Sequence, residues 1–340
     1  MLWKGIRKRP LRHRIGRIKQ YKQSDMSATV TVVMATYNGE KYLAEQLDSI
    51  LAQTYPVSEI IVCDDRSTDG TPALVRSYAA RHPEIKFIEN VRNVGCNLTF
   101  KAAAMAATGD FVAFSDQDDV WYPEKIARQM AHIGGHDICY TDLDRGPAPG
   151  KTHVVSYKGF FEANLFFGIA GHTMLLRRDF IQQEAHWLDD FWYDWSLLLH
   201  AHLHRGVVKL AEPMNWHRDY PDSVTNSQHD KYYKTGQQFP AYEPYVEGLK
   251  NFRRLQQKPR YRRLFRYMSD QTAGTEHRLV HTLCGLLLKR DALSLLRLMW
   301  LCMKHRTTIY PSTRTNGLRG CVRGFFYPFI WAHHSTVFDD

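Results

Sequence analysis

The feature of this 340-residue sequence that most constrains its fold is a regular alternation between residues 29 and 140. Short runs of β-branched and aromatic residues alternate there with stretches whose apolar residues recur at helical spacing. The runs predict strands at 30–34, 60–63, 85–88, 111–114 and 138–140. Strands that alternate with helices of this length are typical of βαβ units. The chain is therefore predicted to be an α/β protein with a mainly parallel sheet.

The intervening stretches carry separate helix signals. Leu43, Leu47 and Leu51 fall on one face at helical spacing. Thr71-Pro72 is typical of an N-cap followed by proline at the first helical position. An alanine-rich stretch ends at Thr108-Gly109, where a helix can stop.

The character of the sequence changes twice along the chain. Residues 141–235 are less regular, and beyond residue 240 the sequence is helical and basic, with arginines interleaved among apolar residues. We therefore expect a basic N-terminal arm at 1–27, an α/β domain at 28–235 and a helical, basic C-terminal region at 236–340.

The net charge of +10 is unevenly distributed, and residues 1–23 hold nine lysines and arginines without an acidic residue. Such a tract suits an anionic membrane surface, a solvated tail or nucleic acid. Nucleic acid is disfavoured as a partner, because no recognised motif is present and the basic segments flank the α/β domain. No window holds the roughly 20 apolar residues of a spanning helix. The six cysteines show no CxxC pairing and several lie in apolar runs, which indicates reduced thiols. We therefore expect a cytoplasmic protein in peripheral contact with an anionic membrane.

Polar, turn-forming loops follow each of the first four predicted strands. In open α/β sheets, ligands bind outside the carboxyl ends of the strands. One such loop would mean little, but four in succession predict a nucleotide-sized site. The loops are 35–39, 64–71, 90–95 and 115–119.

The last of these loops, Ser115-Asp116-Gln117-Asp118-Asp119, places three carboxylates within four residues. Carboxylates so close repel one another unless a cation is present. Oxygen ligands of this kind suit Mg²⁺ or Mn²⁺, and such an ion could neutralise a departing diphosphate. The alternative is an acidic turn in which Asp119 caps the helix that begins near Pro123.

Five short motifs lie within residues 32–125. They are Thr36-Tyr37-Asn38, Asp64-Asp65-x-Ser67-x-Asp69-Gly70-Thr71, Arg92-Asn93-x-Gly95, Thr108-Gly109-Asp110-Phe111 and Ser115–Trp121. With these motifs the segment resembles the family 2 glycosyltransferases, which have the GT-A fold: a Rossmann-like central sheet with flanking helices. The Ser-Asp-Gln-Asp-Asp form followed by Trp121 is most similar to a rhamnosyltransferase-like branch that acts on bacterial surface polysaccharides. The similarity is specific through residue 130 and looser to about residue 225.

The resemblance implies a site for a nucleotide-diphospho-sugar donor. Its residues would be Thr36, Tyr37, Asn38, Asp64, Asp65, Arg92, Asp116 and Gln117. In that site Asp64 or Asp65 would hydrogen-bond the nucleobase, and Asp116 would reach the ribose and the sugar. Asp118 would ligate Mg²⁺ or Mn²⁺.

The resemblance also assigns roles outside the donor loops. Residues 168–172 resemble an acceptor-side loop, and Asp194 lies where inverting members place their catalytic base; the alternative is an acid that merely favours a helix start. Members often complete the metal shell with a histidine, whose place Tyr220 takes here. His217 would then be the third ligand, or water would fill the shell.

These features imply an inverting, metal-dependent glycosyltransferase in bacterial surface polysaccharide biosynthesis, such as that of lipopolysaccharide. It would move a sugar, rhamnose by the similarity of the 115–121 motif, to a hydroxyl of a saccharide or lipid-linked acceptor. The alternative is a catalytically impaired GT-A protein that binds nucleotide-sugars. The missing histidine favours this alternative, and the presence of Asp118 and Asp194 disfavours it.

Overall fold

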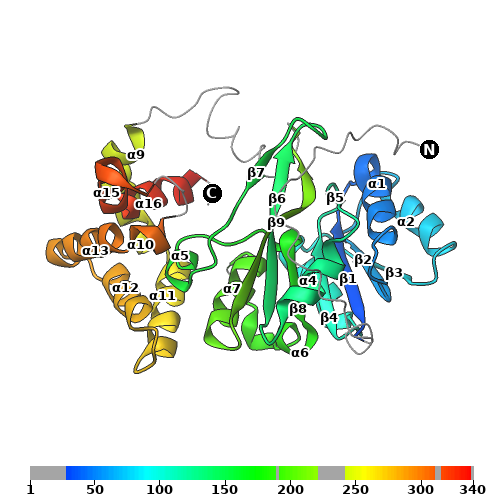
Figure 1. The fold of residues 1–340 in the computed structure, drawn as a ribbon, viewed down its shortest axis with the longest axis horizontal. Coiled ribbons are helices and arrows are strands. Elements are labelled where there is room, and N and C mark those ends of the chain that lie inside the picture. The colour runs from blue at the N-terminus through cyan, green and yellow to red at the C-terminus, as the bar shows by residue number, and fades with distance from the viewer. Residues whose placement is uncertain (1–27, 189–190, 221–241, 311–314, 338–340) are drawn as a thin grey trace, which may run out of the picture.

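The computed structural model describes residues 28–188, 191–220, 242–310 and 315–337. Figure 1 shows an elongated molecule, with a sheet and its flanking helices on one side and a group of helices at the opposite end. The basic arm at 1–27 and the expected boundary near residue 235 lie outside the described residues.

The first part of the sheet is parallel, as predicted. β1 lies between β2 and β4, and β3 pairs with β2 at the edge. Each predicted strand up to residue 114 coincides with an observed one, and helices connect them. These elements are β1 (Val30–Thr36), α1 (Glu40–Leu51), β2 (Glu59–Asp64), α2 (Thr71–Ala79), β3 (Ile85–Glu89), α3 (Cys96–Ala106) and β4 (Phe111–Ser115).

The second part of the sheet mixes directions. β8 pairs antiparallel with both β4 and β6, whereas β9 runs parallel to β6 and antiparallel to β5. The strand order is β3-β2-β1-β4-β8-β6-β9-β5, with β7 paired to β6. The elements are β5 (Val120–Trp121), α4 (Lys125–Ile133), β6 (Ile138–Gly146), β7 (His153–Val155), α5 (Phe161–Asn164), η2 (Gly171–Thr173), β8 (Met174–Arg177), α6 (Arg178–Ile181), η3 (Glu184–His186), α7 (Tyr193–Leu203) and β9 (Val207–Arg218).

Alternating residues of the strands fill two cores, one on each face of the sheet. On β1, Val32 packs in the same core as Leu43 and Leu47 of α1. Its neighbour Val33 points to the other face and packs in the core that contains Phe100 of α3. Burial on both faces explains why these strands read as continuous apolar runs.

The C-terminal helices share a third core with the sheet domain through α5 and α7. Phe166 and Trp195 pack there with Phe252, Phe265 and Trp331. None of the helices in the described ranges is long and apolar enough to cross a membrane. The helices are α9 (Glu243–Val246), α10 (Gly248–Gln257), α11 (Pro259–Thr272), α12 (Arg278–Leu288), α13 (Ala292–Lys304), α14 (Arg306–Ile309), α15 (Gly317–Phe325) and α16 (Tyr327–Val337).

Candidate active site

Hydrogen bonds join the carboxyl ends of β1 and β2. They connect residues that were expected to bind the nucleotide-sugar. Thr36 and Asp64 are register partners, and the Thr36 hydroxyl donates to Asp64 Oδ1 at 2.9 Å. Asp64 also accepts from the backbone N–H and the hydroxyl of Ser67. The Asp64 carboxylate, only 1% exposed, therefore holds the loop after β2.

Asp65 has a similar local task. Its carboxylate accepts from the backbone N–H groups of Val94 and Gly95, both at 2.8 Å, and from the Asn90 side chain. Burial alone would raise its pKa, but these hydrogen bonds hold the pKa of Asp65 below its usual value. Asp65 thus ties the loop after β3 to the end of β2.

Gln117 and Tyr37 join the first and fourth loops. The Gln117 side chain donates to the Tyr37 carbonyl at 3.1 Å and accepts from the Tyr37 N–H at 2.9 Å. The Tyr37 ring remains 49% exposed, so its face can stack on a base. Asn38 Oδ1 accepts a hydrogen bond from the backbone N–H of Thr68. Arg92 lies exposed in the loop after β3.

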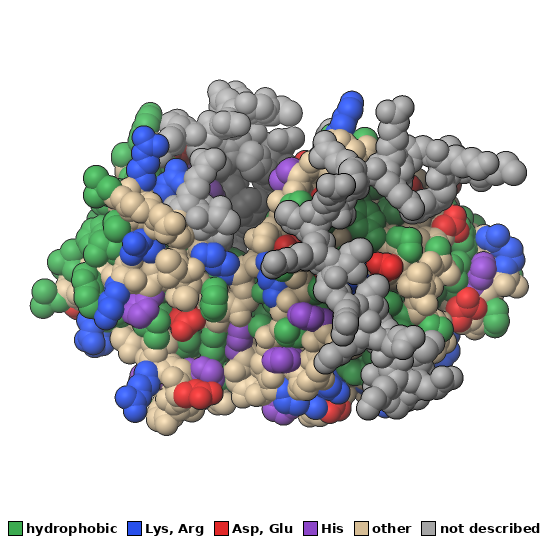
Figure 2. Space-filling model, in the orientation of Figure 1, with side chains coloured by type: hydrophobic (Ala, Val, Ile, Leu, Met, Phe, Trp, Pro, Cys, Tyr) green, Lys and Arg blue, Asp and Glu red, His purple; other side chains and the backbone are tan. Residues whose placement is uncertain are grey.

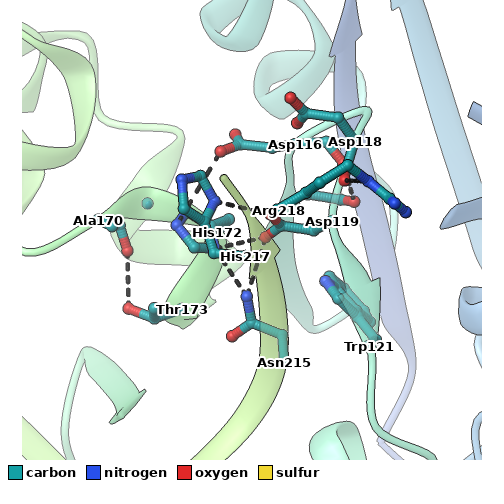
Figure 3. A network of polar contacts seen from close by, with 12 residues as sticks. Asp116, Asp118, Asp119, Trp121, Ala170, His172, Thr173, Asn215, His217 and Arg218 are labelled. Atoms are coloured by element: carbon teal, nitrogen blue, oxygen red, sulfur yellow. Dashed lines mark hydrogen bonds and ion pairs between the residues drawn. The ribbon is translucent and has the colours of Figure 1, made fainter. Parts of the chain in front are cut away.

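Asp119 is the hub of the polar network in Figure 3. Its fully buried carboxylate lies 2.6 Å from His172 Nδ1 and 2.8 Å from His217 Nδ1. The Asn215 side chain donates to the same carboxylate at 2.9 Å. Asp119 is therefore not a helix cap, since the residue that precedes α4 at the cap position is Glu124.

The arrangement leaves the Nε2 atoms of both imidazoles unused by Asp119. His172 Nε2 lies 4.0 Å from Asp116 Oδ2. One ligand atom from each of Asp116, Asp119, His172 and His217 falls within 4.8 Å of the others. Histidines that bind metals usually donate their second ring N–H to a carboxylate. Asp119 suits that orienting role, and the two imidazoles with Asp116 suit a divalent ion.

Two carboxylates of the loop, Asp116 and Asp119, have pKa values shifted in opposite directions. Burial raises the pKa of Asp116 to about 6, whereas the two imidazoles overcome burial at Asp119 and hold its pKa well below the usual value. Burial alone would lower the pKa of His217, but Asp119 raises it to about 9. His217 is therefore an imidazolium at neutral pH, and a metal would have to displace its proton.

The structure gives Asp118 a different setting from the one expected. Its Oδ2 accepts a hydrogen bond from the Tyr220 hydroxyl at 2.7 Å, and it lies outside the four-residue cluster. Tyr220 thus stands against the loop, where it partners a carboxylate. The expected ligation by Asp118 stays a prediction, and His172 is a candidate ligand that sequence reasoning missed.

Asp194 lies at the start of α7 and faces the same network. Its Oδ2 accepts from the Gly171 N–H at 3.1 Å, next to His172, and its Oδ1 accepts from the Trp195 N–H. Burial raises the pKa of Asp194 to about 6. A carboxylate with that pKa can take a proton near neutral pH, as a general base must.

Lys125 supports the histidine side of the site from within the protein. Its fully buried ammonium donates to the His172 carbonyl at 2.5 Å and lies 4.4 Å from the Trp121 ring centroid. Burial lowers the pKa of Lys125 to about 7. Sequence alone offered no reason to separate this lysine from an exposed one at a helix start.

Comparison with known proteins agrees with this geometry. The model for "Glycosyl transferase family 2" matches residues 31–182. The matched segment is less than half of the chain, and over it the chain is similar to this family. It includes every candidate residue described above from Thr36 to His172, and Asp194, Asn215 and His217 follow it.

Individual relatives match about a third of this chain. EpsE of Bacillus subtilis, whose name assigns it as a glycosyltransferase, is 41% identical over 108 residues, which are 32% of this chain and 39% of EpsE. WfgD of Escherichia coli, named UDP-Glc:alpha-D-GlcNAc-diphosphoundecaprenol beta-1,3-glucosyltransferase, is 32% identical over 33% of this chain and 43% of its own. The matches thus span less than half of the length of either relative.

Solved structures extend the likeness to nearly the whole chain. TarS of S. aureus in complex with UDP-GlcNAc aligns with a TM-score of 0.51 over 91% of each chain, at 18% identity. A mannosyltransferase from Pyrobaculum calidifontis, in complex with GDP-Man and Mn²⁺, aligns with a TM-score of 0.51 over 92% of this chain and 88% of its own, at 16% identity. The fold is GT-A, with a C-terminal helical region, as predicted. The rhamnosyltransferase-like branch finds no support among these relatives.

Proposed function

We propose that this protein is an inverting glycosyltransferase that moves a sugar from a nucleotide-diphospho-sugar to a hydroxyl of an acceptor. The observation that carries the proposal is the meeting of three elements at one end of the sheet. The acidic loop after β4, His217 at the end of β9 and Asp194 at the start of α7 all face the segment around His172. Such a site could hold a divalent ion that neutralises the charge of a diphosphate, and it offers a carboxylate base for the acceptor hydroxyl.

The proposed roles follow from the atoms left available. The exposed Tyr37 ring can stack on the nucleobase, and Arg92, which is exposed on an adjoining loop, would meet the base or the phosphates. Asp194 would accept the proton of the acceptor hydroxyl as that oxygen attacks the anomeric carbon. Backbone bonds from Gly171 and Trp195 hold its carboxylate in place, which favours reaction by fixing orientation.

The set of candidate metal ligands fits Mn²⁺ better than Mg²⁺, because imidazole nitrogens accompany the carboxylates. His172, His217 and Asp116 would hold the ion, and the expected ligation by Asp118 is tested separately by Asp118→Ala. A bound ion would neutralise charge on the diphosphate as it leaves.

The finer assignments are also proposals. We take rhamnose as the sugar on the 115–121 motif alone. WfgD, whose name gives a diphosphoundecaprenol-linked acceptor, supports a lipid-linked saccharide in bacterial surface polysaccharide biosynthesis. A lipid-linked acceptor in turn favours a position at the inner face of the cytoplasmic membrane.

A thermal-shift screen of nucleotide-sugars with and without Mn²⁺ tests the donor site. We expect one donor to stabilise the protein in a metal-dependent way, and Asp118→Ala to weaken that effect. Release of the nucleoside diphosphate should then be lost in Asp194→Ala although the donor still binds. Donor binding without release by the wild type would instead support the impaired binding protein, and indifference to every donor would refute both.

A further inference from the structure

Helix α13 is apolar on two sides. Its inner side carries Leu298 and Cys302, both fully buried in the core of the C-terminal helices. Its outer side carries Leu293, Leu296 and Trp300, which are 80%, 54% and 48% exposed. A helix that is hydrophobic all round is normally buried all round. The packing of the residues that the structure describes therefore does not account for the outer side.

Helix α15 packs against α13 and carries further exposed apolar residues. A Cβ on Gly324 would lie 3.1 Å from Met303 Cα, so this glycine allows close approach to the end of α13. Leu318 and Val322, on the opposite side of α15, are 81% and 44% exposed. Figure 2 shows hydrophobic side chains gathered over this end of the molecule, with lysines and arginines among them. We call Leu293, Leu296, Trp300, Leu318 and Val322 the α13–α15 surface.

The charge around the α13–α15 surface is predominantly positive. Across 289–304 and 317–325 the sole acidic residue is Asp291, which is occupied as the N-cap of α13 through a bond from the Ser294 N–H. Lys304 places its ammonium 5.1 Å from the Trp300 ring centroid. The basic residues of these two segments are Lys289, Arg290, Arg297, Lys304, Arg319 and Arg323.

We propose that the α13–α15 surface docks on an anionic lipid bilayer. Leucine and tryptophan side chains enter the boundary between headgroups and acyl chains, and the basic residues meet lipid phosphates. This inference identifies the surface behind the peripheral placement proposed above, and it rests on that placement.

Charge argues against the other occupants. A second copy of the chain would bring two positive surfaces face to face, and the basic segment 1–23 would do the same. Nucleic acid offers phosphates but no apolar phase for Leu293 and Trp300. A bilayer supplies both an anionic layer and hydrocarbon.

Co-sedimentation of the full-length protein with vesicles tests the proposal. At low salt we expect binding to phosphatidylglycerol-containing vesicles and little binding to pure phosphatidylcholine. Leu293→Glu or Trp300→Glu should weaken binding by about tenfold or more, and Arg297→Gln or Arg319→Gln by about fivefold. Val154→Glu, at a residue of β7 that is 55% exposed, is the matched control and should bind as the wild type does.

Three outcomes would overturn the proposal. Leu293→Glu and Trp300→Glu could bind anionic vesicles as tightly as the wild type, which would leave the basic arm as the only contact. Neutral vesicles could bind equally well. Alternatively, the wild type could self-associate through this surface, become monomeric in Leu293→Glu and ignore vesicles. Nucleotide-sugar thermal shifts on the same preparations report separately on the proposed function, since neither residue lies near the donor loops.

Discussion

At the residue scale, Asp119 decides how the site is organised. Its carboxylate contacts the imidazoles of His172 and His217 and accepts a hydrogen bond from the Asn215 amide. Asp119 therefore orients the groups that would contact a metal, and its own carboxylate is not free. The carboxylates that remain are Asp116, near His172, and Asp118, bonded to Tyr220. One acidic loop thus supplies three side chains with three different tasks.

Replacement of Asp119 should weaken metal binding. In Asp119→Asn, His172 and His217 lose the carboxylate that fixes their ring orientation. Loss of such a partner typically costs about 10- to 100-fold in metal affinity. Calorimetric titration with Mn²⁺ measures the change, and Asp48→Asn, on the outer side of α1, is the control. An unchanged Mn²⁺ affinity would show that Asp119 does not orient the ligands.

The raised pKa of Asp194 predicts the pH dependence of transfer. The proposed base would be active as the carboxylate, so turnover with saturating donor and metal should be level above pH 6. Below its pKa of about 6 the rate should fall by about tenfold per pH unit. Asp194→Asn should lower turnover by about 10²-fold or more and abolish the fall in rate on the acid side of the pH profile. The affinity for the nucleotide-sugar should stay the same. An acid limb that persists in Asp194→Asn would assign it to another group, such as Asp116.

At the element scale, the short 3₁₀ turn η2 connects the two halves of the site. Gly171 donates its N–H to Asp194, and His172 follows it immediately. The turn can sit there because Gly171 has no side chain: a Cβ would lie 2.2 Å from the Tyr193 hydroxyl. The position of the His172 imidazole relative to the start of α7 is therefore fixed.

Gly171→Ala should displace this turn. We expect a loss of about 1–3 kcal/mol in the free energy of unfolding, because overpacking forces neighbouring groups to move, together with a lower turnover number. Tyr193→Phe removes the hydroxyl that the new methyl group would meet, so the double variant should recover part of both losses. Urea unfolding and initial rates measure the two effects. If Gly171→Ala matches the wild type in both, the turn is not under this constraint.

At the scale of the whole molecule, α7 joins the sheet domain to the C-terminal helices. Trp195 packs toward Phe252 and Phe265, and His200 lies buried between Ser196 and the Tyr267 hydroxyl. Burial lowers the pKa of His200 to about 4, so the folded protein keeps this histidine neutral under mildly acidic conditions.

That buried imidazole predicts acid sensitivity of the junction. Between pH 6.5, the ordinary value, and about 4, the unfolded chain binds a proton at His200 that the folded chain does not. Stability contributed by the neutral imidazole is therefore lost as pH falls through this window, by up to about 1.4 kcal/mol per pH unit. Urea unfolding at pH 7 and pH 5 measures the loss, and His200→Gln should reduce the slope relative to the wild type. Equal slopes would mean that His200 protonates without unfolding.

The sequence by itself determined the α/β class, the first four strands and the loops that follow them. These properties depend on local spacing: apolar runs mark buried strands, and polar turns mark their ends. The strand pattern located the acidic loop, and the resemblance located Asp194 and His217. The structure brings all of them to one place.

Tertiary structure alone decided how those residues divide their work. His172 and Asn215 lie 53 and 96 positions from Asp119 in the sequence, and no local pattern links them to it. They meet because β8 inserts beside β4 and because β5 pairs with β9. Long-range strand pairing therefore puts Asp119, for which a helix cap was the alternative interpretation, at the centre of the candidate site. It also sets the ring nitrogens of His172 and His217 toward Asp116. Burial within that assembly then raised the pKa of Asp194, a property that no sequence spacing contains.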